Sequence, residues 1–166
     1  GLLDESLHFG MDYDLLIRIA GQFDIIRTDE VLSKYRLHSS SKTVSQLPRF
    51  AGEWARVFSR FLNSTDIPAS TLSLLSENGF YFPNEPSIRI KHQLLKEDID
   101  LIVTYFLFYQ LIIYYEVLDM QMVKHILEMI HTLSPSFYSK MNLKRIAVRS
   151  RFLPPVLIQL FRAIAR

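Results

Sequence analysis

The chain has 166 residues, of which 49% are hydrophobic and 22% charged, a balance that provides enough apolar material for a globular core. This composition excludes a disordered tail and a collagen-like fibre. The absence of cysteine and a net charge of only +2 exclude a disulfide framework, a cysteine-ligated zinc site and a thiol nucleophile, and they give no reason to expect nucleic acid as a partner.

The first 43 residues have the pattern of a short α/β segment. Residues 12–20 have helical spacing of apolar side chains and predict a helix that stops at Gly21. Residues 22–28 and 31–38 predict two short strands. The second strand alternates, so three side chains share one of its faces: Lys34, Arg36 and His38. Because one helix and two strands bury little surface, we expect either that the helical region covers this segment or that it is the tail of a larger α/β domain.

The rest of the chain has helical patterns. Helices are expected at residues 48–62, 68–77, 88–97, 98–117 and 119–133, followed by a basic helical end. Residues 101–115 carry no charge but are too few for a membrane span, so a core helix is expected there. The predicted fold class is mainly α with a short α/β tail, divided into residues 1–43, a helical region at 44–138 and basic amphipathic helices at 139–166.

Positive charge is concentrated at the C-terminal end. Residues 1–128 hold 17 acidic and 12 basic residues, whereas residues 129–166 hold seven basic residues and no acidic one. The basic residues alternate with Leu143 and Ile146 at helical spacing, and a very apolar segment follows Pro154-Pro155. This combination is typical of helices that lie in a membrane interface. Membrane contact is therefore expected from Lys144, Arg145, Arg149 and Arg151, and the alternative is a solvated basic face on helices that pack within the protein.

Three short motifs follow one another in residues 1–43. They read GLLDESL at 1–7, GMDYDLLIR at 10–18 and VLSKYRLHSSS at 31–41. Their order and spacing resemble the closing part of the catalytic domain of family-2 glycosyltransferases, which have the GT-A fold. The resemblance covers a quarter of the chain. It implies transfer of a sugar from a nucleotide-activated donor with the help of a divalent metal, Mn or Mg, whose D-x-D ligand motif this chain lacks.

The resemblance also implies roles for individual residues. Asp12 resembles the catalytic base, which removes the proton of the acceptor hydroxyl, and an ordinary N-cap is its structural alternative. His38 resembles a histidine that joins the metal and the diphosphate. Four further residues are candidates for substrate binding: Asp4, Glu5, Asp14 and Arg36. Asp14 and Arg18 are four residues apart, so Asp14 is also expected to orient Arg18.

Met11 stands where the family often has glutamate, which removes one carboxylate that could hold the acceptor. Alternatives remain open for the other candidates as well. Asp4 and Glu5 can be solvated loop acids, and Arg36 and His38 can lie on a solvated strand edge. The glycosyltransferase interpretation requires that Asp12 and His38 face a common cleft.

The function implied by the resemblance is transfer of a hexosyl group from a nucleotide-sugar to a glycan or lipid-linked acceptor, in cell-envelope polysaccharide synthesis and with inversion. The parent enzyme is expected in the cytoplasm, peripheral at the inner face of the plasma membrane. Because no nucleotide-binding half with a D-x-D motif precedes Gly1 in this chain, the chain alone is expected to be an inactive fragment that does not bind a nucleotide-sugar. The alternative function is a non-catalytic helical module that binds a partner protein through residues 44–166.

Overall fold

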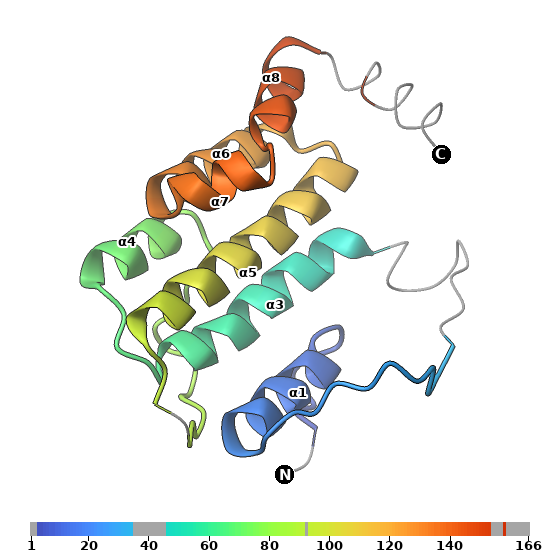
Figure 1. Ribbon diagram of the computed structural model, residues 1–166, viewed down its shortest axis with the longest axis vertical. Coiled ribbons are helices and arrows are strands. Elements are labelled where there is room, and N and C mark those ends of the chain that lie inside the picture. The colour runs from blue at the N-terminus through green and yellow to red at the C-terminus, as the bar shows by residue number, and fades with distance from the viewer. Residues whose placement is uncertain (1–2, 35–45, 92, 154–157, 159–166) are drawn as a thin grey trace. The chain divides into compact units, whose positions relative to one another are not determined.

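The computed structural model describes residues 3–34, 46–91, 93–153 and 158. These described residues form seven helices and no strand (Figure 1). The chain divides into two compact units, Gly1–Leu95 and Lys96–Arg166. We refer to them as unit 1 and unit 2.

The mainly helical fold class is confirmed, but the predicted α/β tail with two strands is wrong in the part of the chain that the structure describes. Residues 24–29 and 31–34 follow α1 (Met11–Gln22) without joining a ladder. Neighbouring side chains are exposed on both sides of the backbone, with Ile25 at 70% and Ile26 at 90%, and Val31 at 80% and Leu32 at 77%. A strand depends on cross-strand pairs and a buried face, and this segment has neither among the described residues. Residues 35–38 lie outside them.

In unit 1, α3 (Leu47–Leu62) carries most of the buried apolar side chains. Pro48 lies in its first turn, where a missing backbone N–H breaks no helical bond. The helix expected at residues 48–62 is present, and six of its apolar side chains are buried: Ala51, Ala55, Val57, Phe58, Phe61 and Leu62. A turn leads from α3 to α4 (Ala69–Glu77), which buries Leu75.

The first helix of unit 1 packs on α3 through aromatic pairs. The ring centroids of Phe9 and Phe50 are 4.9 Å apart, and those of Tyr13 and Trp54 are 5.6 Å apart. Such pairs contribute beyond the area they bury. The loop before α1 and the first turn of α1 are thereby fixed against one face of α3.

The sequence predicted that Gly21 ends α1, but the helix continues to Gln22. A Cβ atom at Gly21 would lie 2.7 Å from the carbonyl oxygen of Arg89. The predicted helix at 88–97 is also wrong, because the described residues from 88 to 95 are not helical. The backbone N–H of Lys91 instead donates to the Gly21 carbonyl at 2.6 Å, so the glycine permits a close approach of two backbones.

Unit 2 consists of α5 (Lys96–Glu116), α6 (Met120–Leu133), α7 (Pro135–Lys140) and α8 (Lys144–Phe152). α6 packs against α5, α7 and α8. Asp119 caps α6 by accepting a hydrogen bond from the Met122 N–H at 3.0 Å. Asn142, with φ of 51°, makes the turn between α7 and α8, and asparagine tolerates this left-handed conformation.

α5 contains the uncharged run from Leu101 to Tyr115. Among the described helices it is long and apolar enough to cross a membrane by length and composition, a property that it shares with core helices of soluble proteins. It packs against α6 and buries Val103, Leu107 and Leu111. Leu101 and Tyr109 of the same helix are 50% and 57% exposed, so the core helix stays a prediction.

Candidate functional site

The loop before α1 is held by one carboxylate of α3. Glu53 Oε1 accepts from the backbone N–H of His8 at 3.1 Å, and Glu53 Oε2 accepts from those of Phe9 at 2.7 Å and Gly10 at 2.8 Å. Burial alone would raise the pKa of Glu53, but these three N–H groups outweigh it and lower that pKa. The side chain is therefore an ionised clamp on the chain that enters α1.

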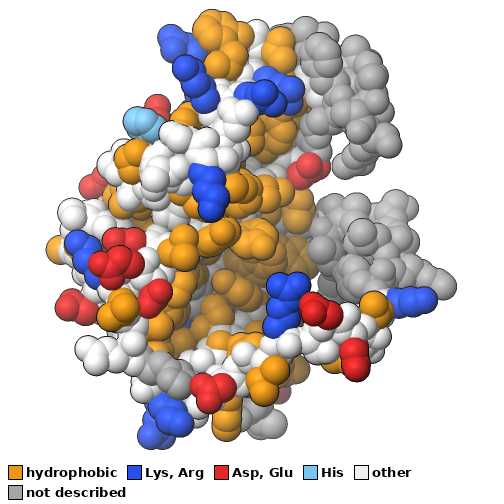
Figure 2. All heavy atoms as spheres, in the orientation of Figure 1, with side chains coloured by type: hydrophobic (Ala, Val, Ile, Leu, Met, Phe, Trp, Pro, Cys, Tyr) orange, Lys and Arg blue, Asp and Glu red, His pale blue; other side chains and the backbone are white. Residues whose placement is uncertain are grey.

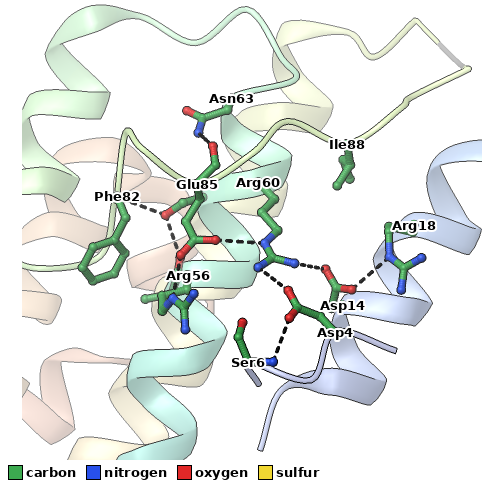
Figure 3. A network of polar contacts seen from close by, with 12 residues as sticks. Asp4, Ser6, Asp14, Arg18, Arg56, Arg60, Asn63, Phe82, Glu85 and Ile88 are labelled. Atoms are coloured by element: carbon green, nitrogen blue, oxygen red, sulfur yellow. Dashed lines mark hydrogen bonds and ion pairs between the residues drawn. The ribbon is translucent and has the colours of Figure 1, made fainter. Parts of the chain in front are cut away.

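One guanidinium of α3 holds three carboxylates from distant parts of unit 1. Arg60 Nη2 lies 2.7 Å from Asp4 Oδ2, Nη1 lies 2.8 Å from Asp14 Oδ1, and Nε lies 3.0 Å from Glu85 Oε2 (Figure 3). The Arg60 side chain is only 8% exposed. Burial alone would lower its pKa, but the three carboxylates raise it. Arg60 thus stays charged and joins the loop, α1 and the segment after α4.

Two further arginines complete this arrangement, which we call the Arg60 cluster. Arg18 Nε lies 2.9 Å from Asp14 Oδ2, and Arg56 Nε lies 2.6 Å from Glu85 Oε1. The cluster comprises three carboxylates and three guanidinium groups: Asp4, Asp14, Glu85, Arg18, Arg56 and Arg60. The Asp14–Arg18 contact expected from the sequence is confirmed. The charges balance, so the cluster can be buried without a net charge.

Asp4, a candidate for substrate binding, is partly exposed but engaged by contacts within unit 1. Its Oδ1 accepts from the Ser6 backbone N–H at 2.9 Å. Hydrogen bonds from the Ser6 side chain and then from Arg60 hold the pKa of Asp4 well below its usual range. Asp14, the second such candidate, is 1% exposed and bonded to two arginines. Both carboxylates position backbone within unit 1.

Asp12 is placed differently from these two carboxylates. It is exposed, and it lies in the first turn of α1. Gly10 is the N-cap, so the alternative of Asp12 as the cap is wrong. Asp12 Oδ1 accepts from the Tyr13 backbone N–H at 2.8 Å, and no described residue donates to Oδ2. Glu5 is also exposed, in the turn that precedes the helix.

Two candidates cannot be placed beside Asp12. Arg36 and His38 lie outside the described residues, so the requirement of a cleft shared by Asp12 and His38 stays a prediction. The described residues contain no group of three or more His, Asp or Glu side chains that could hold a metal ion. They therefore do not provide a ligand set for the divalent metal that the resemblance implies, and we assign no step to a metal.

The basic candidates for membrane contact all lie on α8. Four of its side chains are exposed, Lys144, Arg145, Arg149 and Arg151, which fits both membrane contact and the alternative of a solvated basic face. The apolar segment after Pro154-Pro155 falls outside the described residues except for Ile158. The structure thus describes the basic part of this predicted interface.

The sequence analysis missed Glu53, Arg60 and Glu85. A signal for Arg60 was present, because it follows Val57 by three residues and Arg56 by four and so interrupts the apolar face of α3 with charge. Glu53 and Glu85 gave no such signal. Their roles depend on contacts across 25 to 45 residues of sequence.

Comparison of the chain with protein-family models, with curated proteins and with solved structures found no significant match.

Proposed function

We propose that residues 4–18 form the acceptor side of a glycosyltransferase site, with Asp12 as the catalytic base. The observation that carries the proposal is the contrast among the carboxylates of this region. Asp4 and Asp14 are held by Arg60, whereas Asp12 is exposed and one of its oxygens has no donor among the described residues. This is the arrangement that a general base requires: a fixed backbone and a free carboxylate oxygen.

The proposed reaction is a single displacement. The acceptor hydroxyl oxygen forms a bond to the anomeric carbon of the sugar, and the bond from that carbon to the nucleoside diphosphate breaks. The diphosphate leaves with the bonding electron pair, and the hydroxyl proton passes to Asp12 Oδ2. One base and one displacement invert the anomeric configuration. The donor is a nucleotide-sugar, and the acceptor is a glycan or a lipid-linked saccharide.

The supporting residues have separate roles in this proposal. Glu53 fixes the backbone of residues 8–10, directly before the first turn that carries Asp12. Arg60 fixes Asp14 two residues after it. Glu5, which is exposed, remains a candidate for binding the acceptor.

The test uses the product of the complete reading frame that encodes this chain. Hexose transfer from a panel of nucleotide-sugars is measured for the wild type, Asp12→Asn and the matched control Asp66→Asn. Asp66 is an exposed aspartate in the turn after α3. Asp12→Asn is expected to lower kcat by about 100-fold or more, the usual contribution of a general base, while the donor KM and the Asp66→Asn activity stay unchanged. Full activity of Asp12→Asn, or no transfer by the wild type, would contradict the proposal.

A second candidate function is the binding of a partner protein. The sequence analysis placed this function in residues 44–166, but the observation that favours partner binding lies in the segment after α1, where Phe23 is 63%, Ile26 90% and Val31 80% exposed. Partner binding does not require the carboxylate of Asp12, and an interaction module would transfer no sugar. The same transfer assay therefore separates the two functions, and Ile26→Asp with Val31→Asp would abolish capture of a partner while leaving any sugar transfer unchanged.

A further inference from the structure

We propose that an open groove lined by α6, α7 and α8 binds the phosphate of an anionic phospholipid headgroup. The groove lies within unit 2 and has a volume of about 900 Å³, which is the size of a small-ligand site. This inference does not depend on sugar transfer by unit 1. It rests on the side chains that line the groove and on those that surround it.

Cationic side chains dominate the charge of the groove. Lys124 of α6 and Lys144 and Arg151 of α8 line it, and Glu128 is the one carboxylate among the described residues that line it. An arginine fork and lysine ammonium groups are the usual protein ligands of phosphate oxygens. The groove therefore favours an anionic ligand over a neutral or cationic one.

Neutral hydrogen-bonding groups complete the lining. Tyr138, Ser139 and Asn142 present two hydroxyls and an amide, which suit the non-bridging oxygens of a phosphate and the hydroxyls of a glycerol headgroup. The rings of His131 and Tyr138, both of which line the groove, meet edge to face with centroids 4.9 Å apart. This contact joins α6 to α7, so that side of the groove is preformed.

A neighbouring face of α8 indicates a membrane as the source of the phosphate. Lys144, Ala147 and Arg151 line the groove, whereas Arg145, Val148 and Phe152 follow one another at helical spacing on another face. Val148 is 48% and Phe152 69% exposed. Figure 2 shows basic side chains beside hydrophobic ones over α8. Exposed apolar side chains do not contribute to binding a soluble phosphate, but they can insert into a lipid surface.

The local charge agrees with this choice. Residues 129–166 contain no acidic residue and seven basic ones, so little in this part of the chain repels an anionic leaflet. Each basic residue that lies near an anionic membrane surface adds to the attraction between the protein and that surface. The groove adds a specific site to this general attraction, and that difference makes the proposal testable.

The test compares two double variants of the full chain that lose the same charge from the same helix. Lys144→Gln with Arg151→Gln changes the groove, and Arg145→Gln with Arg149→Gln changes exposed residues that do not line it. Binding of short-chain phosphatidylglycerol below its micelle concentration is followed by NMR. The groove variant is expected to bind about tenfold more weakly or worse, and the control variant about as tightly as the wild type. Circular dichroism checks that both variants fold.

Two further arms identify the source of the phosphate. Wild-type chain is expected to float with vesicles of phosphatidylcholine containing phosphatidylglycerol and not with phosphatidylcholine alone, and the groove variant is expected to lose flotation. Inorganic phosphate is expected to compete only weakly. Equal losses in both double variants, equal binding to the two vesicle types, or phosphate binding as tight as lipid binding would each overturn the proposal.

Discussion

Arg60 Nη1 lies 2.8 Å from Asp14 Oδ1, and the two side chains are only 8% and 2% exposed. This ion pair joins α3 to α1 in the part of unit 1 that carries Asp12. Truncating one partner of a buried pair leaves the other charge without compensation. Arg60→Met is therefore expected to lower the free energy of unfolding by about 3–5 kcal/mol. Asp4 would lose its guanidinium partner, and the cluster would keep three carboxylates against two guanidinium groups.

Urea unfolding followed by tryptophan fluorescence measures this loss. Trp54 is the single tryptophan of the chain and lies in α3, so it reports on unit 1. Arg49→Met is the matched control, since Arg49 is an exposed arginine of the same helix, and a change within about 0.5 kcal/mol is expected for it. A loss below about 1 kcal/mol for Arg60→Met would show that the cluster contributes no more than a surface ion pair.

Substitution of Glu53 is expected to cause the second largest loss of unfolding free energy in the site. Glu53→Ala removes the acceptor of three backbone N–H groups at 2.7 to 3.1 Å, two of them part-buried. Hydrogen bonds to a charged group are the strong ones, so a loss of about 2–3 kcal/mol is expected. Glu53→Gln keeps one acceptor oxygen and should lose less. Glu77→Ala, at an exposed glutamate of α4, is the control, and an equal effect at both positions would contradict the clamp.

The stability of unit 1 is expected to fall in acid. The folded-state pKa values of Asp4 and Glu53 are lowered from ordinary values of 3.8 and 4.5. A lowered pKa stabilises the folded state above the ordinary value, and that stabilisation is lost as the pH falls toward the folded value. Unfolding free energy should therefore change little through these groups above about pH 5.5 and decline below about pH 4.5.

Glu53→Gln separates the contribution of Glu53 from the rest of this pH dependence. The variant is expected to have a shallower decline below about pH 4.5, while Asp66→Asn keeps the decline of the wild type. Identical slopes for Glu53→Gln and the wild type would show that the hydrogen bonds to residues 8–10 do not stabilise the ionised carboxylate.

Local pattern predicted the helices whose apolar face is buried, and it failed where structure depends on distant residues. The helix expected at residues 48–62 matches α3, Leu47–Leu62, closely, because a helix forms its backbone bonds within itself. The alternation at residues 31–38 predicted a strand, but a strand needs a partner, and the described part, residues 31–34, has none among the described residues. Helical periodicity at residues 88–97 was misleading for a related reason, since Lys91 bonds to Gly21 across the chain.

In the candidate site, too, the contacts between neighbouring residues were predicted and those between distant residues were not. Asp12 and Asp14 were singled out from a local motif, and the local pair of Asp14 with Arg18 followed from their spacing. Arg60 forms hydrogen bonds with residues 25 to 56 positions away in the sequence. A local sequence pattern therefore could not predict its contacts with Asp4, Asp14 and Glu85. The sequence division at residue 43 also separated α1 from α3, although Glu53 and Arg60 join these helices within one compact unit.

Two glycines offer a matched test of the close approach at the end of α1. A Cβ atom at Gly21 would lie 2.7 Å from the Arg89 carbonyl oxygen, which belongs to backbone and must shift, whereas one at Gly52 of α3 meets nothing within 4 Å. Gly21→Ala is expected to lower the unfolding free energy by about 1–3 kcal/mol, and Gly52→Ala to raise it by about 0.5–1 kcal/mol. Both values come from the Trp54 urea titration. If Gly21→Ala stabilised the chain as Gly52→Ala does, the segment that contains Arg89 and Lys91 would not lie against α1 in solution.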